Sequence, residues 1–253
     1  MPITEVFSNP TVSRVIFQVR FPNLFFLESK VGEYQMLVMK QFPHSQLGYR
    51  RNIMIADVGP EVKMDELPRP PDEVQVARIW SFRSNEGVEL NLQTSSLDIS
   101  SAVHKTYNNE QAEERFRDTI RLAVDSFLEI VSIPLFTRIG LRYIDDCPVP
   151  AATNEVYREW YSTTFPLDRF AVSDALEMLF RGRMRRGEFF LTYAESFRTD
   201  DAKPKLVLDF DGYAENVLAE EYLSVTDRLH EMISREFEQS IRDPVYSHMR
   251  GGM

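Results

Sequence analysis

Strict alternation of apolar and polar side chains constrains this fold more than any other feature. In residues 11–21 one parity is apolar: Val15, Phe17, Val19 and Phe21. The other parity is mostly polar: Arg14, Ile16, Gln18 and Arg20. Because side chains repeat every two residues along a strand, this segment is predicted to be half-buried. Residues 135–144 alternate in the same way, with Arg138 and Arg142 on the polar side. This alternation predicts a sheet with one face covered and the other exposed to solvent.

The segment 76–93 predicts a β-hairpin whose register can be worked out. Its apolar pattern sets two cross-strand pairs: Phe82 with Leu90, and Trp80 with Leu92. This pairing leaves a three-residue loop in which Gly87 takes the left-handed position. A two-residue loop would place Phe82 opposite Glu89 and mix the two faces, so the longer loop is favoured.

The remaining elements follow from helical and alternating patterns. Helices are predicted at 30–42, from Asn108 or Asn109 to Pro134, at 154–164 and at 224–242. Strands are predicted at 49–57, 95–100, 135–144, 174–184, 188–196 and 205–211. The second helix has an apolar stripe that should anchor the core: Phe116, Ile120, Val124, Phe127 and Val131. Ser224 and Asp227 approximate a capping box at the start of the last helix.

Residues 57–74 contain four prolines and are predicted to form a polar linker or surface loop. Pro68 and Pro71 make a PxxP pattern, which could adopt a polyproline helix and dock on an aromatic groove. The alternative is a stiff exposed loop.

The element order through residue 144 matches a ferredoxin-like split βαβ pattern with extra strands. In that pattern the first and last strands are neighbours, which brings two polar rows together: Arg14, Gln18 and Arg20 beside Arg138, Gly140 and Arg142. We therefore predict an α+β fold, with a mostly antiparallel sheet and helices on one face. The ferredoxin-like first half precedes a βββα second half. Residues 1–253 are predicted to form a single compact unit with two lobes, about 1–150 and 151–253.

The two halves resemble each other in outline. The stretches RSNEGVELNL and RMRRGEFFLT each place a glycine, Gly87 or Gly187, at the third loop position of a predicted hairpin. Each half then has another strand and a long helix. An ancient duplication would explain this, and so would the frequent recurrence of units built from strands and a helix.

Charge and cysteine content narrow the function classes. The net charge of −10 argues against a general binder of nucleic acid or anionic membranes, because such binding needs a positive field. Cys147 is the only cysteine, so neither an internal disulfide nor a CxxC zinc site can form, which indicates a reducing cytosol. No signal-peptide pattern and no apolar run of about 20 residues is present. The expected location is cytoplasmic, without membrane association.

Three stretches carry a resemblance to a known family: VSRVIFQVRF, LFTRIGLRYID, and LVLDFDGY followed by LHEMISREFEQSI. Together they are similar to a sporadically distributed family of uncharacterised bacterial and archaeal proteins of about this length. The resemblance implies a prokaryotic, intracellular protein, and it supplies no established activity, cofactor or catalytic residue. Scattered occurrence among strains is associated with mobile or defence-related genes.

Two aspartate pairs are weak candidates for metal ligands: Asp145 with Asp146, and Asp209 with Asp211. Such carboxylates could hold Mg²⁺. However, LVLDFDGY also fits ordinary strand alternation before a turn at Gly212, and the four histidines lie far apart, so no metal or other cofactor is expected. The chain lacks GxSxG, GxGxxG and Walker motifs, and nearby acids should raise the pKa of Cys147.

Arginine clusters are the main binding candidates. FRGRMRRGE carries four arginines near a hairpin tip: Arg181, Arg183, Arg185 and Arg186. The predicted sheet face adds Arg14, Arg20, Arg138 and Arg142. Arginine binds phosphate or carboxylate in a bidentate manner, although such charges also protect sheet edges.

Two functions are therefore carried forward. The first is a non-enzymatic binding or interaction module with an unknown protein partner. The second is a metal-dependent enzyme, or a defence-associated effector, that acts on nucleic acid or nucleotides. In the second, the aspartates would hold the metal and the arginines would contact phosphate.

Overall fold

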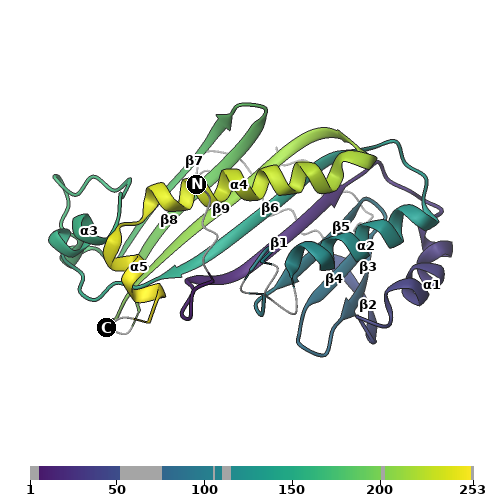
Figure 1. The fold of residues 1–253 in the computed structure, drawn as a ribbon, viewed down its shortest axis with the longest axis horizontal. Helices are drawn as coiled ribbons and strands as arrows, with labels where there is room; N and C mark the ends of the chain where they lie inside the picture. The colour runs from purple at the N-terminus through teal and green to yellow at the C-terminus, as the bar shows by residue number, and fades with distance from the viewer. Residues whose placement is uncertain (1–5, 52–75, 105, 110–114, 201–202, 252–253) are drawn as a thin grey trace, which may run out of the picture.

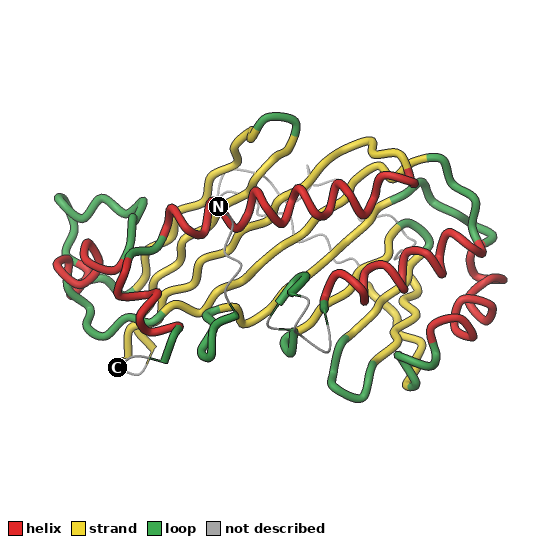
Figure 2. Tube along the Cα trace, in the orientation of Figure 1, coloured by secondary structure: helices red, strands yellow, loops and turns green. Residues whose placement is uncertain are grey.

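The computed structural model describes residues 6–51, 76–104, 106–109, 115–200 and 203–251. They form a nine-stranded antiparallel sheet in the order β2-β3-β4-β5-β1-β6-β9-β8-β7. Helices α1, α2 and α4 lie on one face of this sheet, and α3 and α5 lie near one end of it, as Figure 1 and Figure 2 show. Helices α1 and α2 cover the half that contains β1 to β5, and α4 crosses the half that contains β6 to β9. The predicted α+β class with a mostly antiparallel sheet is confirmed.

The element bounds follow the chain in two lists. The strands are β1 Val12–Arg20, β2 His44–Arg51, β3 Val76–Arg83, β4 Glu89–Gln93, β5 Ser96–Ser101, β6 Leu135–Cys147, β7 Glu177–Arg186, β8 Phe189–Asp200 and β9 Lys203–Leu218. The helices are α1 Leu27–Val38, α2 Phe116–Ile130, α3 Asn154–Trp160, α4 Tyr222–Ser240 and α5 Asp243–Met249, with 3₁₀ turns at Val172–Asp174 and Ala219–Glu221. In the described part of the chain, no helix is both long and apolar enough to span a membrane.

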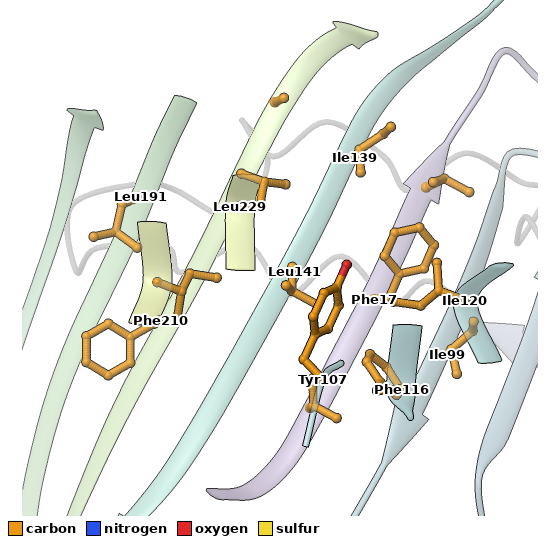
Figure 3. Close-up of a cluster of buried hydrophobic side chains, with 14 of the residues drawn as sticks. Phe17, Ile99, Tyr107, Phe116, Ile120, Ile139, Leu141, Leu191, Phe210 and Leu229 are labelled. Atoms are coloured by element: carbon orange, nitrogen blue, oxygen red, sulfur yellow. The ribbon is translucent and has the colours of Figure 1, made fainter. Parts of the chain in front are cut away.

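Strand β1 lies near the middle of the sheet and pairs with β5 on one edge and β6 on the other. Its alternation is confirmed, since Phe17 is fully buried and lies opposite Ile99 and Leu141. The close-up in Figure 3 shows these side chains beneath α2, whose Phe116 and Ile120 point down onto the sheet. The predicted stripe of α2 therefore forms the core of this half, although α2 begins at Phe116, later than the predicted caps.

The first hairpin has the register that its pattern predicts. Phe82 lies opposite Leu90, Trp80 lies opposite Leu92, and Gly87 has a φ of 91°. The prediction for the second hairpin is wrong. Arg186 pairs directly with Phe189, so Gly187 occupies the first position of a two-residue loop, with a φ of 62°. The pairing of β7 with β8 continues to Arg186, so only Gly187 and Glu188 remain in the loop.

The predicted turn at Gly212 is also wrong, because β9 continues through this residue to Leu218. Gly212 lies opposite Leu141 of β6 and Leu191 of β8, on the side that α4 covers. A Cβ atom at this position would lie 2.8 Å from Cε of Met232 and 3.0 Å from Cδ1 of Ile233. Glycine is required here by the close approach of α4 to the sheet.

Several other predicted boundaries differ from the structure. The predicted capping box of the last helix is wrong: Ser224 donates to the carbonyl of Glu221, and Asp227 bonds to side chains outside its own helix. The last predicted helix, 224–242, corresponds to α4, and a further short helix, α5, follows it at Asp243–Met249 and was not predicted. Strand β2 begins at His44, before the predicted start at residue 49. The proline-containing linker at 57–74 lies outside the described residues.

We expect Gly212→Val to lower the free energy of unfolding by about 1–3 kcal/mol, because the new side chain overlaps Met232 and Ile233. Valine suits a strand, so the loss would report on the packing of α4. Gly32→Ala in α1 is the matched control, because its Cβ meets nothing within 4 Å. This substitution should raise the free energy of unfolding by about 0.5–1 kcal/mol. Urea denaturation followed by circular dichroism measures both. Equal stability of Gly212→Val and wild type would contradict the close approach.

Candidate functional site

The face of the sheet opposite the helices carries most of the predicted binding residues. We call the side chains that β1, β6, β9, β8 and β7 present on this side the polar face. The prediction that the strand at 11–21 pairs with the strand at 135–144 is confirmed: in β1 and β6, Gln18 lies opposite Gly140 and Arg20 lies opposite Arg138. Arg14 lies farther along β1, opposite Ile144. Arg14 and Arg20 are exposed, and Arg20 donates to the side chain of Gln18.

Two arginines of β6 form ion pairs with two aspartates of β9, and each arginine contacts both carboxylate oxygens of its partner. Nη2 of Arg138 lies 2.9 and 3.0 Å from the carboxylate oxygens of Asp211. Arg142 donates from Nε and Nη2 to Asp209 at 2.7 and 2.5 Å. The hydrogen bond to Asp209 raises the pKa of Arg142. These aspartates are therefore occupied by neighbouring guanidinium groups, and each charge is balanced locally.

The other predicted aspartate pair is separated by the strand itself. Strand β6 continues to Cys147, so Asp145 points to the helix side and is buried, whereas Asp146 is exposed on the opposite side. Asp145 accepts a hydrogen bond of 2.8 Å from Thr11, and burial raises its pKa to about 7. The four aspartates do not converge. Over the described ranges, no three His, Cys, Asp or Glu side chains are grouped so that they could hold a metal ion.

Aromatic rings on the polar face lie between the arginines. The ring of Tyr213 lies 4.6 Å from the guanidinium carbon of Arg138 and 5.3 Å from that of Arg183. Tyr213 also stacks on Phe190, with centroids 5.2 Å apart, and Arg183 lies over Phe190 as well. Such cation–π and stacking contacts fix the orientation of all four side chains.

Gly140 makes this arrangement possible. It lies opposite both Gln18 and Tyr213, in the middle of the polar face. A Cβ atom at Gly140 would lie only 2.3 Å from Nη1 of Arg138. The missing side chain therefore leaves the space in which the Arg138 guanidinium rests.

The arginines of the second hairpin divide between the two sides of the sheet. Arg183 and Arg185 belong to the polar face, together with Arg181, because they lie opposite β8 residues of that side. Arg186 points to the helix side and pairs with Glu236 of α4 at 2.5 Å. It borders a hollow of about 410 Å³, whose other arginines are also paired: Arg228 with Glu188, and Arg235 with Glu231.

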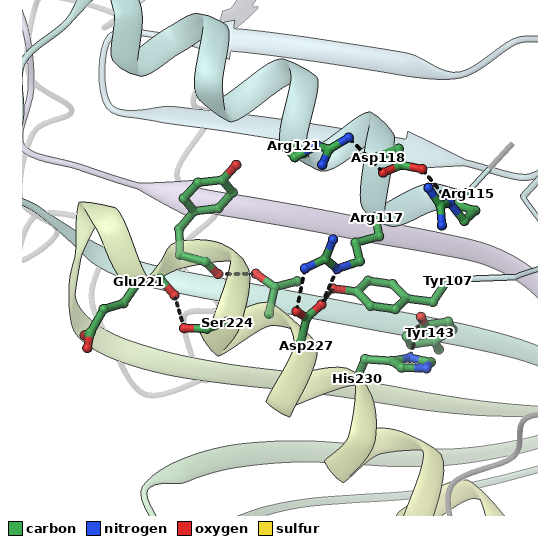
Figure 4. A network of polar contacts seen from close by, with 12 residues as sticks. Tyr107, Arg115, Arg117, Asp118, Arg121, Tyr143, Glu221, Ser224, Asp227 and His230 are labelled. Carbon is green, nitrogen blue, oxygen red and sulfur yellow. Dashed lines mark hydrogen bonds and ion pairs between the residues drawn. The ribbon is translucent and has the colours of Figure 1, made fainter. Parts of the chain in front are cut away.

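A second polar cluster joins α2 to α4 on the helix side, as Figure 4 shows. Arg117 of α2 donates to both oxygens of Asp227 in α4, at 2.7 and 2.8 Å. The hydroxyl of Tyr107 donates to the same carboxylate at 2.7 Å. The ring of Tyr107 stacks on His230 with centroids 4.3 Å apart, and Tyr143 bonds to Nδ1 of His230 at 3.0 Å. We call these five residues the helix clamp.

The protonation states of the helix clamp are fixed near neutral pH. Burial lowers the pKa of His230 to about 4 and raises the pKa values of Tyr107 and Tyr143. A general acid or base is most effective when its pKa lies near the working pH. The clamp is therefore suited to holding two helices together. Burial likewise raises the pKa of the Cys147 thiol, ahead of the nearby acids, which makes it a weak nucleophile.

Sequence reasoning missed the aromatic members of the polar face and the whole helix clamp. Tyr213 and Phe190 could have been found by continuing the β9 alternation through Gly212, which places Tyr213 in the same row as Asp209 and Asp211. Asp227 gave a misleading signal, because its spacing from Ser224 resembled a capping box.

Comparison with known proteins finds no matching family model, no similar curated protein and no similar solved structure. Function must therefore be argued from the side chains themselves.

Asp227→Ala should lower the free energy of unfolding by about 1–3 kcal/mol, because it leaves Arg117 and the Tyr107 hydroxyl without their shared acceptor. Asp168→Ala provides the control, since Asp168 is almost fully exposed beside Arg158 and its pair should contribute less than about 1 kcal/mol. Urea denaturation compares the two variants. Equal losses would show that the clamp adds nothing beyond a surface ion pair.

Asp145→Asn should change how stability depends on pH. The folded-state pKa of about 7 lies above the ordinary value of 3.8, so the stability from protonated Asp145 is full below about pH 4 and is lost as pH rises to 7. Asparagine cannot ionise, so the variant should gain roughly 3 kcal/mol relative to wild type between pH 4.5 and 7. The lowered pKa of His230 has the opposite effect, because both proteins lose stability as pH falls from 6.5 toward 4. This effect cancels when the variant is compared with wild type. Chemical denaturation at each pH measures the difference, and a constant difference would contradict a raised Asp145 pKa.

Proposed function

We propose that this chain is a non-enzymatic binding protein that engages an acidic protein partner through the β6, β9, β8 and β7 part of its polar face. The observation that carries this proposal is the ordered array of Arg138, Tyr213, Arg183 and Phe190 on the side of the sheet opposite the helices. Tyrosine and arginine, together with tryptophan, are enriched at the energetic centres of protein interfaces.

Preorganisation supports a binding role for this array. Arg138 is held by Asp211 and by the space above Gly140, and Tyr213 is held between two guanidinium groups. Side chains that are already ordered lose little conformational entropy when a partner binds. The free energy gained from a contact with a partner would therefore be offset only slightly by a loss of side-chain entropy.

The charges of β7 favour an acidic partner. The side chain of Arg183 is 62% exposed, and its ion pair with Glu215 is long, at 3.9 Å. Arg181 and Arg185 are exposed, and neither forms an ion pair with another described residue. The overall charge of −10 opposes a polyanion as extended as nucleic acid, whereas an acidic protein segment needs only a local cationic strip.

The enzymatic alternative receives less support from the geometry. It requires Asp209 and Asp211 to act on a metal or substrate, yet both oxygens of each carboxylate accept hydrogen bonds from an arginine of the adjacent strand. Asp145, whose pKa is raised to about 7, is buried on the other side of the sheet.

Binding of a fluorescein-labelled poly-glutamate peptide, measured by anisotropy over a range of salt concentrations, tests this function. We expect salt-sensitive binding that weakens about tenfold in the variant Arg183→Ala/Arg185→Ala, since two exposed charge contacts are lost. The control Arg228→Ala/Arg235→Ala removes the same net charge from α4 and should bind as wild type does.

Two results would contradict the proposal: no binding of poly-glutamate at low salt, or equal weakening by the β7 and α4 variants. Tighter binding of a DNA duplex than of poly-glutamate, also lost in Arg183→Ala/Arg185→Ala, would favour the nucleic-acid alternative.

A further inference from the structure

Strand β7 forms one end of the nine-stranded sheet and pairs only with β8 among the described strands. It pairs regularly over all ten residues, Glu177 to Arg186, without a register shift. Figure 1 shows the β7–β8 hairpin extending past α4, away from the body of the molecule. An edge strand presents a row of N–H and C=O groups that another strand can pair with.

The side chains of β7 form two contrasting rows. Every side chain in the row on the polar face is exposed: Glu177, Leu179, Arg181, Arg183 and Arg185. The row on the helix side is mainly apolar: Met178, Phe180, Gly182, Met184 and Arg186. Phe180 is 37% exposed, and Met178 and Met184 are only partly buried against the core. The edge therefore combines a cationic row with an apolar row that is incompletely covered.

A second copy of the chain is a poor match for this edge. Antiparallel self-pairing centred on Arg181 or Arg183 places that arginine opposite its own copy. Pairing centred on Gly182 places Arg181 opposite Arg183. Registers shifted toward Glu177 can place that residue opposite Arg181 or Arg183, but they pair only five or seven of the ten residues and leave Arg185 without a partner. Directly opposed like charges destabilise a strand pair, whereas opposite charges stabilise it. The edge is complementary to a strand with acidic side chains at alternate positions.

We infer that β7 binds an extended acidic segment of a partner protein by strand addition. Aspartate or glutamate side chains of that segment lie opposite Arg181, Arg183 and Arg185, and apolar side chains lie on the helix side beside Phe180 and Met184. In an antiparallel pair, opposite residues share a face, so an alternating acidic–apolar pattern satisfies both rows at once. Main-chain hydrogen bonds supply affinity, and the two rows supply specificity. This inference rests on the proposed function and specifies its mode.

Peptides of alternating glutamate and valine, as long as the ten residues of β7, test the mode of binding. The probe set also contains a peptide of the same composition with all glutamates grouped at one end, and an alternating lysine–valine peptide. Two further alternating glutamate–valine peptides are N-methylated, one at every glutamate amide and the other at every valine amide. N-methylation removes the hydrogen-bond donors of one peptide edge while retaining charge.

We expect the alternating acidic peptide to bind about tenfold more tightly than the grouped one, and the lysine peptide not to bind. One of the two N-methylated peptides should lose binding, because only one edge of an added strand faces β7. Amide hydrogen exchange in β7 should slow when the unmodified peptide binds, whereas exchange in α4 should not change.

Charge reversal provides a further test that leaves the core untouched. Arg183→Glu should weaken binding of the glutamate peptide and allow the lysine peptide to bind. Arg228→Glu on α4 should have neither effect. Retained binding of both N-methylated peptides, or unchanged exchange in β7, would overturn strand addition while the poly-glutamate result still supported an acidic partner. Failure of every acidic probe would overturn both proposals.

Discussion

The hydrogen bonding of β6 on both of its edges is the constraint on which the rest of this structure depends. It pairs with β1 on one side and with β9 on the other, so it joins the strands of the first half to those of the second. Its alternation sends Ile139 and Leu141 into the core and Arg138 and Arg142 to the polar face. A slip of one residue would exchange these sets, burying two arginines. The cost of burying unpaired charge therefore fixes the register of β6 against β1 and β9.

The two sides of the sheet use polar groups in different ways. On the helix side, Asp227 draws Arg117 and Tyr107 together, so that helices from the two halves are fixed to each other. On the polar face, the Arg138–Asp211 pair is no more exposed than the Arg117–Asp227 pair, and it lies against the buried ring of Tyr213. Ion pairs of similar exposure therefore join two helices on one side of the sheet and orient an aromatic ring on the other.

Local patterns predicted those parts of the fold that neighbouring residues determine. The Phe82–Leu90 register and the buried Phe17 follow from alternation, because a strand has only two faces. Gly212 and Asp227 were misassigned because their roles depend on distant residues: Gly212 on α4, and Asp227 on Arg117, 110 positions earlier. The pairs of Arg138 with Asp211 and of Arg142 with Asp209 were only partly predictable. Alternation placed each residue on the polar side of its strand, but it could not show that β9 is the neighbour of β6.

At Gly140 the chemistry of a surface depends on the absence of one carbon atom. The space beside it is filled by the far end of Arg138. A larger residue would displace this guanidinium group and leave the ladder between β1 and β6 in place. One substitution at this position would therefore move charge across the face while the paired strands kept their places.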